Sequence, residues 1–211
     1  MNETLTERCF VFVKPEHFSR ASEVMGYFNS VLQNYGGVIF YKTVDEVPEK
    51  IADAHYALHR GKIKQGVNIH QALVGQLTGK PVTLAVYEGN PGLTKRIIEL
   101  VGHRDPAIAR QQKFIEENGK PVETIRGKFS DPEESEARAL AERYATANVM
   151  HRADSIISTL RELRVWAQFL KEYSRWPAGE ALVLNLLENL EFPSREFCAL
   201  LEGYSPQRMR Q

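Results

Sequence analysis

The chain has 211 residues, enough for one well-packed domain plus an appendage. Its 27 basic side chains balance its 27 acidic ones, so no overall positive field attracts nucleic acid or anionic lipid. No run approaches the ~18 apolar residues of a membrane span, and the two cysteines lack a metal-binding spacing. We therefore expect a cytoplasmic protein with reduced thiols that binds neither nucleic acid nor membrane.

Hydrophobic periodicity predicts strands and helices that alternate along the chain. In order, they are a strand at 9–13, a helix within 17–35, a strand at 38–47, helical pieces within 48–78, a strand at 82–87 and a helix at 93–101. Asp105-Pro106 then favours the start of another helix, with Asp as its cap and Glu116 to Gly119 as its stop. A polar stretch at 131–145 is rich in helix-forming residues.

The last predicted strand is Val149-Met150, and His151 stands where it ends. Asp154 or Ser155 can cap the following helix. The apolar residues that recur at helical spacing along it are Ile156, Leu160, Leu163, Ala167 and Leu170. Glu162 falls about two turns in, close enough for its carboxylate to fold back toward the strand end. A histidine oriented by a carboxylate suits a nucleophile, although a lone histidine before a helix is more often structural.

Four strands with helices in this order favour an α/β (α+β) fold: a ferredoxin-like split βαβ with a four-stranded antiparallel sheet and added helices. We expect residues 5–165 to form this domain, with inserts at 107–123 and 131–145. Residues 166–211 would form a helical extension, with amphipathic pieces near 178–190 and 194–202 that dock on the core or on a neighbouring subunit. His55 and His59 are four residues apart on a predicted helix but lack the acidic neighbour of an H-E-x-x-H motif, so we predict no metal site there.

Several separated stretches together resemble the nucleoside diphosphate kinase family. They are Glu7–Pro15, Gly79–Gly89, Gly102–Pro106, Thr124–Phe129 and Asn148–Ser155. The stretches stand in the family's order and span about residues 5–165, and the last two match its most diagnostic segments.

The resemblance implies a phosphotransferase. In that family a histidine attacks the γ-phosphate of a nucleoside triphosphate, and the phosphohistidine then passes the group to a nucleoside diphosphate. On this basis His151 is the nucleophile and Glu162 orients its ring. Mg²⁺ is the implied cofactor, bridging the nucleotide phosphates rather than sitting in a protein cage. Because family members are usually homo-oligomers, we expect a homo-oligomer here.

The resemblance also implies which side chains bind the nucleotide. Lys14 and Arg126 would neutralise charge on the transferring phosphates in a water-poor cleft. Tyr56 would line the phosphate site, and Asn148 would contact the sugar hydroxyls. Ile69 falls at the position of the aromatic residue that stacks on the base.

Some positions depart from the family pattern. The family's phosphate-binding arginine would fall at Ile98. The threonine of its Gly-x-Thr-Asn/Asp-Pro corner, which Gly102–Pro106 resembles, is Arg104 here. Where the family has a small residue directly after the histidine, this chain has Arg152, and where the family then has a serine, it has Ala153. We hypothesise that Arg104, together with Lys95, replaces the missing phosphate contact.

These departures leave a second reading open. The chain could be a nucleotide-binding or assembly module that keeps the fold and catalyses little or no transfer. Ile98 and Ala153 favour the module, whereas the retention of His151 with Glu162 favours the enzyme.

Overall fold

The structure, a computed structural model, describes residues 6–145 and 148–173, with side chains as far as Trp166. The chain divides into two units, Met1–Leu163 and Arg164–Gln211, and the fold below belongs to the first. The amphipathic pieces predicted near 178–190 and 194–202 lie outside the described residues.

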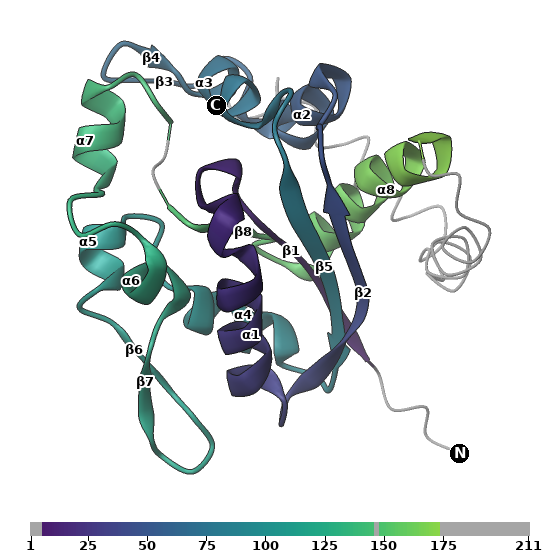
Figure 1. The fold of residues 1–211 in the computed structure, drawn as a ribbon, viewed down its shortest axis with the longest axis vertical. Coiled ribbons are helices and arrows are strands. Elements are labelled where there is room, and N and C mark those ends of the chain that lie inside the picture. The colour runs from purple at the N-terminus through teal and green to yellow at the C-terminus, as the bar shows by residue number, and fades with distance from the viewer. Residues whose placement is uncertain (1–5, 146–147, 174–211) are drawn as a thin grey trace, which may run out of the picture. The chain divides into compact units, whose positions relative to one another are not determined.

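Four strands form the central sheet: β1 (Glu7–Val13), β2 (Gly36–Val44), β5 (Val82–Gly89) and β8 (Met150–Arg152). Their order is β2-β5-β1-β8, and every neighbouring pair is antiparallel (Figure 1). β1 pairs with β5 over its whole length, from Glu7 opposite Gly89 to Val13 opposite Thr83. This strand order confirms the predicted ferredoxin-like fold with a four-stranded antiparallel sheet.

The main hydrophobic core lies between one face of this sheet and helices α1 (Ala21–Leu32) and α4 (Leu93–Val101). Val11 and Tyr87 from the strands pack there with Phe28 of α1 and Ile97 of α4. The Glu7 carboxylate accepts hydrogen bonds from the first backbone N–H groups of α4, at 2.7 Å from Gly92 and 2.9 Å from Thr94. An anion at a helix N-terminus is favourable, so β1 fixes where α4 begins. Those two bonds also hold the pKa of Glu7 below its ordinary value, against the opposing effect of burial.

The opposite face of β1 presents two buried aromatic rings, Phe10 and Phe12. The ring of His55, at the end of α2 (Glu49–His55), lies edge-on to Phe12 with the centroids 5.4 Å apart. The alternation of side chains along β1 therefore separates the main core on one face from the candidate site on the other.

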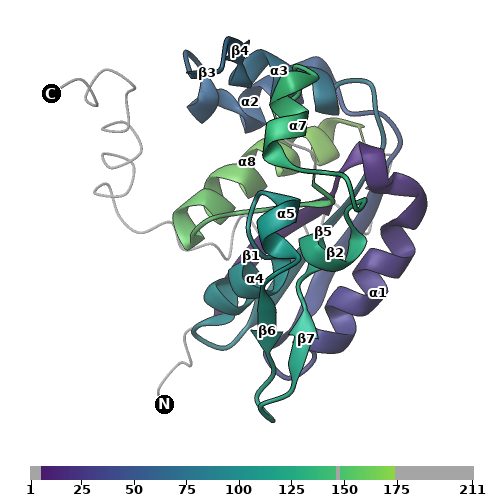
Figure 2. The same ribbon diagram turned by 90° about the vertical axis from the view of Figure 1, so that its left-hand side faces the viewer.

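Smaller elements fill the connections between the strands. They are the 3₁₀ helices η1 (Pro15–Arg20) and η2 (Ala57–His59), the hairpin β3 (Ile63–Lys64) with β4 (Val67–Asn68), α3 (Ile69–Leu77), α5 (Pro106–Ala109), the hairpin β6 (Lys113–Ile115) with β7 (Pro121–Glu123), α6 (Ile125–Phe129) and α7 (Glu136–Ala141). Figure 2 shows the β6–β7 hairpin extending below α5 and α6.

Two predicted helical stretches contain hairpins. Within 48–78 the chain turns through Gln65 and Gly66, whose φ angles are 49° and 76°, which suits a two-residue hairpin turn. The helix predicted from Asp105 to Glu116 lasts only for α5, because β6 and β7 then pair around a turn that contains Gly119 at φ 81°. Asp105 does cap α5 as predicted, accepting from the N–H of Ala107 at 2.9 Å.

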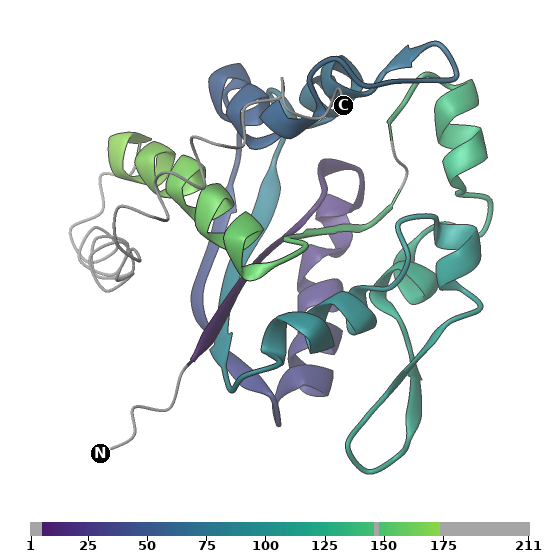
Figure 3. The same ribbon diagram turned by 180° about the vertical axis from the view of Figure 1, so that it is seen from behind.

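Helix α8 (Ile156–Tyr173) follows β8, which lies beside β1 (Figure 3). Ser155 rather than Asp154 caps it, because the Ser155 hydroxyl accepts from the N–H of Ser158 at 3.1 Å. Ile156, predicted on the apolar face, is 47% exposed, while Thr159 and Glu162 are buried. The buried face of this turn is therefore partly polar. Among the described residues, no helix combines the length and apolar character needed to span a bilayer.

Candidate active site

His151 is the middle residue of β8, and not the residue after a strand as predicted. The strand continues because Arg152 pairs with Val11 in the antiparallel ladder. The His151 ring stacks on the ring of Phe12, its partner in β1, with centroids 4.6 Å apart and planes 18° apart. The position of this imidazole is thus set by the sheet, with 18% of the side chain exposed.

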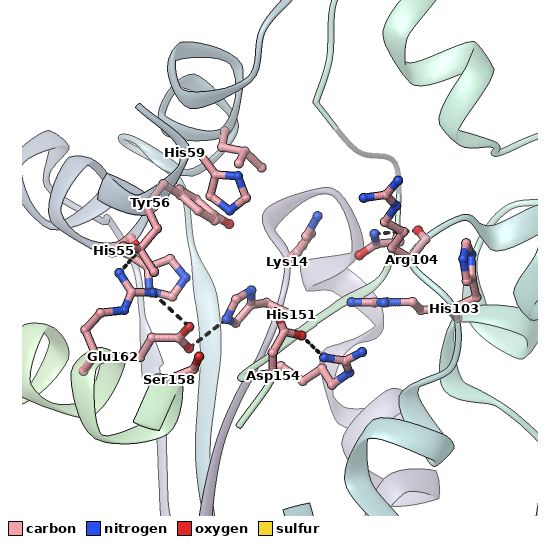
Figure 4. A pocket seen from close by; sticks show the side chains of 16 residues that line it. Lys14, His55, Tyr56, His59, His103, Arg104, His151, Asp154, Ser158 and Glu162 are labelled. Carbon is pink, nitrogen blue, oxygen red and sulfur yellow. Dashed lines mark hydrogen bonds and ion pairs between the residues drawn. The ribbon is translucent and has the colours of Figure 1, made fainter. Parts of the chain in front are cut away.

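Glu162 is hydrogen-bonded to the His151 ring. Its Oε2 lies 2.8 Å from His151 Nε2, and only 4% of its side chain is exposed (Figure 4). Arg161 Nη2 lies 3.4 Å from the other carboxylate oxygen. With the carboxylate accepting, Nε2 carries the hydrogen and Nδ1 keeps its lone pair. The edge of the ring away from Glu162 faces the side of the pocket where Lys14 lies (Figure 4).

Burial and nearby cations keep this imidazole neutral. They lower the pKa of His151 well below its ordinary value, with burial as the largest cause and the charges of Lys14 and Arg126 next. Burial also raises the pKa of Glu162, while neighbouring His55 and Arg161 oppose that rise. A neutral imidazole with a free lone pair is the form that can act as a nucleophile.

Two buried cations converge on the histidine from different parts of the chain. Lys14 directly follows β1, and its backbone N–H donates to Val149 O at 2.9 Å. Arg126, from α6, donates to Met150 O at 3.1 and 2.7 Å and to Gly102 O at 3.1 Å. Burial lowers the pKa of Lys14 to about 8. Burial, together with the nearby charge of Arg152, lowers the pKa of Arg126 to about 9. Both groups are held as cations at an energetic cost that a bound anion would offset.

These side chains line a cavity of about 390 Å³. Its charged lining comprises Lys14, Arg104, Arg126, Arg152 and Arg161 against Asp154 and Glu162. Positive groups thus outnumber carboxylates around His151, and the cavity favours an anionic ligand.

Tyr56 and Asn148, both predicted to bind the nucleotide, also line the cavity. Tyr56 is 6% exposed, and burial raises its pKa. The Asn148 amide donates to Arg104 O at 3.0 Å, which links the segment before β8 to the corner before α5. The structure therefore gathers around one cavity His151, Glu162 and four buried residues among those predicted to bind the nucleotide: Lys14, Tyr56, Arg126 and Asn148.

The remaining predicted residues are less well placed. Ile69 and Lys95 are not among the residues that line the cavity. Arg104 lines it, but its side chain is 67% exposed and its Nε lies 3.4 Å from Glu136 Oε1, an ion pair across to α7. Sequence reasoning could not foresee that partner.

Arg96, the arginine nearest to Ile98 in sequence, has a structural role. Its guanidinium lies between the rings of Tyr35 and Phe114, 4.6 and 4.2 Å from their centroids. It also donates to the Tyr35 hydroxyl at 2.7 Å. The β6–β7 hairpin is thereby attached to α4, and this arginine is committed to packing.

His55 is a site residue that the sequence analysis missed. It is 1% exposed, and its ring centroid is 4.6 Å from that of His151. Burial lowers its pKa to about 3. Arg161 donates to the backbone carbonyl of His55 at 3.1 Å, which joins α8 to α2. The sequence singled out His55 only with His59, as a pair at which we predicted no metal site; its adjacency to the predicted Tyr56 is the feature that could have placed it at this site.

The cavity suits a metal ion that arrives bound to the anionic ligand better than an ion held by the protein alone. Ligand atoms of His55, His151 and Glu162 lie within 4.8 Å of one another, a set that could surround a cation. However, Lys14 and Arg126 act on His151 with positive charge, which opposes a divalent ion. Within the described lining, Asp154 and Glu162 are the only carboxylates, too few for an oxygen cage around Mg²⁺.

The fold and the site together define a histidine–glutamate pair in a cationic cavity on a ferredoxin-like sheet. Comparison with known proteins identifies the family. A family profile described as nucleoside diphosphate kinase matches residues 7–171. The chain belongs to the nucleoside diphosphate kinase family, as its motifs predicted.

Relatives and solved structures agree with this assignment. Nucleoside diphosphate kinase from Rhodococcus opacus is 30% identical over 165 residues, which is 77% of this chain and 95% of that protein. The Mycobacterium marinum enzyme is 30% identical over 162 residues, 77% of this chain and 97% of that protein. A transition-state mimic of the Borrelia burgdorferi kinase with bound vanadate and ADP superposes with a TM-score of 0.61 at 20% identity, covering 78% of this chain and 88% of that one. The Aquifex aeolicus kinase gives 0.56 at 22% identity, covering 77% and 95%. These structures support the fold.

Proposed function

We propose that the protein is an active nucleoside diphosphate kinase that works through a phosphohistidine at His151. The observation that carries the proposal is the 2.8 Å hydrogen bond between His151 Nε2 and Glu162, which leaves Nδ1 at a cavity lined by cations. Phosphoryl transfer depends mainly on positioning and on neutralising charge, and this arrangement supplies both.

In the first half-reaction, the γ-phosphate of a nucleoside triphosphate is held by Lys14 and Arg126. The lone pair of His151 Nδ1 forms a bond to phosphorus while the bond from phosphorus to the bridging oxygen breaks. That oxygen leaves with the nucleoside diphosphate and keeps the electron pair. His151 Nε2 keeps its hydrogen, and the Glu162 carboxylate balances the positive charge that develops on the ring.

In the second half-reaction, a nucleoside diphosphate replaces the first product and its terminal oxygen attacks the same phosphorus. The bond to Nδ1 breaks, and the imidazole recovers its lone pair. Mg²⁺, carried by the nucleotide rather than by protein carboxylates, would neutralise charge on the phosphate oxygens when bound. Tyr56 and Asn148 would contact the phosphates and the sugar, as their place in the cavity lining allows.

Labelling with γ-³²P-ATP tests this proposal. The wild-type chain should acquire acid-labile, base-stable label, and His151→Ala should abolish it. His70→Ala is the matched control, because His70 pairs with Asp53 outside the cavity lining. Absence of label on the wild type would refute the kinase and favour the nucleotide-binding module, for which Ile98 and the ion-paired Arg104 argue.

We also propose that the protein is a homo-oligomer in the cytoplasm, by analogy with its family. Light scattering coupled to size-exclusion chromatography would measure the mass. A mass equal to that of one 24.0 kDa chain would contradict the proposed oligomer.

A further inference from the structure

Arg152 is a cationic side chain at the site to which the proposed mechanism gives no role. It directly follows His151 on β8 and lines the same cavity. It also lines a neighbouring depression of about 530 Å³, which includes Ile98 and Gly102. Its side chain is 15% exposed, so the guanidinium is largely enclosed where these two hollows adjoin.

The guanidinium of Arg152 has hydrogen-bonding capacity left over. Nη1 donates to the Asp154 carboxylate, a group whose side chain is 83% exposed. The buried Nε has no hydrogen-bond partner among the described residues. Because a guanidinium carries five N–H donors in a planar fork, Arg152 can bind a second anion while Asp154 holds one end.

Arg152 also lies close to other positive charge. Its charge contributes to lowering the pKa of both Arg126 and His151. Arg126 itself bonds only to neutral backbone carbonyls within the described residues. Two neighbouring guanidinium groups repel each other, and an anion placed between them would convert that repulsion into attraction.

Resting on the kinase function proposed above, we propose that Arg152 binds the β-phosphate of the nucleoside diphosphate and shares it with Arg126. This contact would then come from strand β8, because Ile98 of α4 offers only an apolar side chain. Arg104 is the weaker candidate, because it is 67% exposed and shares Glu136 with Lys64, whose Nζ lies 2.8 Å from Oε1.

Calorimetric titration of the full chain with ADP and with AMP tests the assignment, because AMP lacks the phosphate in question. Arg152→Ala should weaken ADP binding about tenfold or more, equivalent to about 1.4 kcal/mol, and change AMP binding less than about twofold. Arg152→Lys should fall between the two, because an ammonium keeps the charge and loses the planar fork. Thermal unfolding of each variant would verify that it is folded.

Two further variants complete the experiment. Arg60→Ala is the matched control, since Arg60 likewise pairs with a single carboxylate, that of Asp53, away from the cavity lining; it should bind ADP as the wild type does. Arg104→Ala tests the rival residue. Wild-type affinity for ADP in Arg152→Ala, equal weakening of ADP and AMP, or a wild type that does not bind ADP would each overturn the assignment.

The titration needs no phosphoryl transfer, so it is separate from the labelling experiment. A wild type that binds ADP but takes no label would refute the kinase proposal. The ratio of ADP to AMP affinity in Arg152→Ala would still decide the role of Arg152.

Discussion

Replacing Glu162 by glutamine tests whether the carboxylate assists transfer by its charge or only holds the ring. In the structure Glu162 Oε2 lies 2.8 Å from His151 Nε2, and the carboxylate is almost fully buried. Glutamine keeps an acceptor oxygen of similar shape but removes the negative charge. As His151 gains a phosphoryl group its ring becomes cationic, so the charge should matter more in the transition state than in the free enzyme.

The expected size of the effect follows from hydrogen-bond energies. A bond to a charged group contributes about 1.5–3 kcal/mol, and a neutral one about 0.5–1.5 kcal/mol. The difference, about 1–1.5 kcal/mol, corresponds to phosphorylation of His151 that is roughly tenfold slower.

Rapid-quench measurement of a single turnover with γ-³²P-ATP isolates the phosphorylation step. Glu123→Gln is the matched control, because Glu123 forms an exposed ion pair with Lys128 at 3.3 Å. A Glu162→Gln rate within about twofold of the wild type would refute the reasoning and leave Glu162 as a spacer.

Two further predictions follow from the buried cations and from the corner beside them. Because the pKa of Lys14 is about 8 and that of His151 lies well below its usual range, kcat/KM should stay flat from about pH 6.5 to 7.5 and fall as Lys14 loses its proton above about pH 8. In Lys14→Arg the fall should move to higher pH; an acid limb near pH 6.5 in the wild type would contradict the lowered pKa of His151. Gly102→Ala should destabilise the fold in urea more than Gly119→Ala does. Both glycines have φ above +80°, but a Cβ at 102 would lie 2.7 Å from Thr124 Oγ1, whereas one at 119 would meet no atom of the described residues within 4 Å. Both changes incur the positive-φ cost of about 1–2 kcal/mol, and overpacking adds about 1–3 kcal/mol at 102; equal losses would show that Thr124 moves aside freely.

The sequence predicts elements well where local pattern and tertiary environment agree. Strands β1 and β5 are buried on both faces, and each contains the continuous apolar run that such burial requires. Helix α4 matches its predicted bounds, because turn chemistry before Leu93 and Gly102 after Val101 mark both ends. The short hairpins were missed because strands of two or three residues carry too little pattern to outweigh helix-prone neighbours.

The site residues likewise divide into those that the local sequence predicts and those that it does not. The sequence alone could predict that Glu162 approaches His151, because only a short turn and the start of a helix separate the two residues. By contrast, Lys14 and Arg126 are more than a hundred residues apart, and only the family resemblance suggested that they meet. The pairing of Arg104 with Glu136 depends on where α7 lies, which no local pattern specifies.

The position of β8 at the edge of the sheet explains why replacing Arg126 tests the charge of the cavity less specifically than replacing Arg152. Among the described strands β8 has one neighbour, β1, so carbonyl groups along its other side lack ladder partners there. Arg126 bonds to one of them, Met150 O, through two nitrogens and also reaches Gly102 O, so it fastens α6 and the corner to the strand. Removing Arg126 would therefore disturb the fold and the charge of the cavity together. Arg152 pairs with a mostly solvated carboxylate two residues away, so its removal should change chiefly the charge of the cavity that it lines.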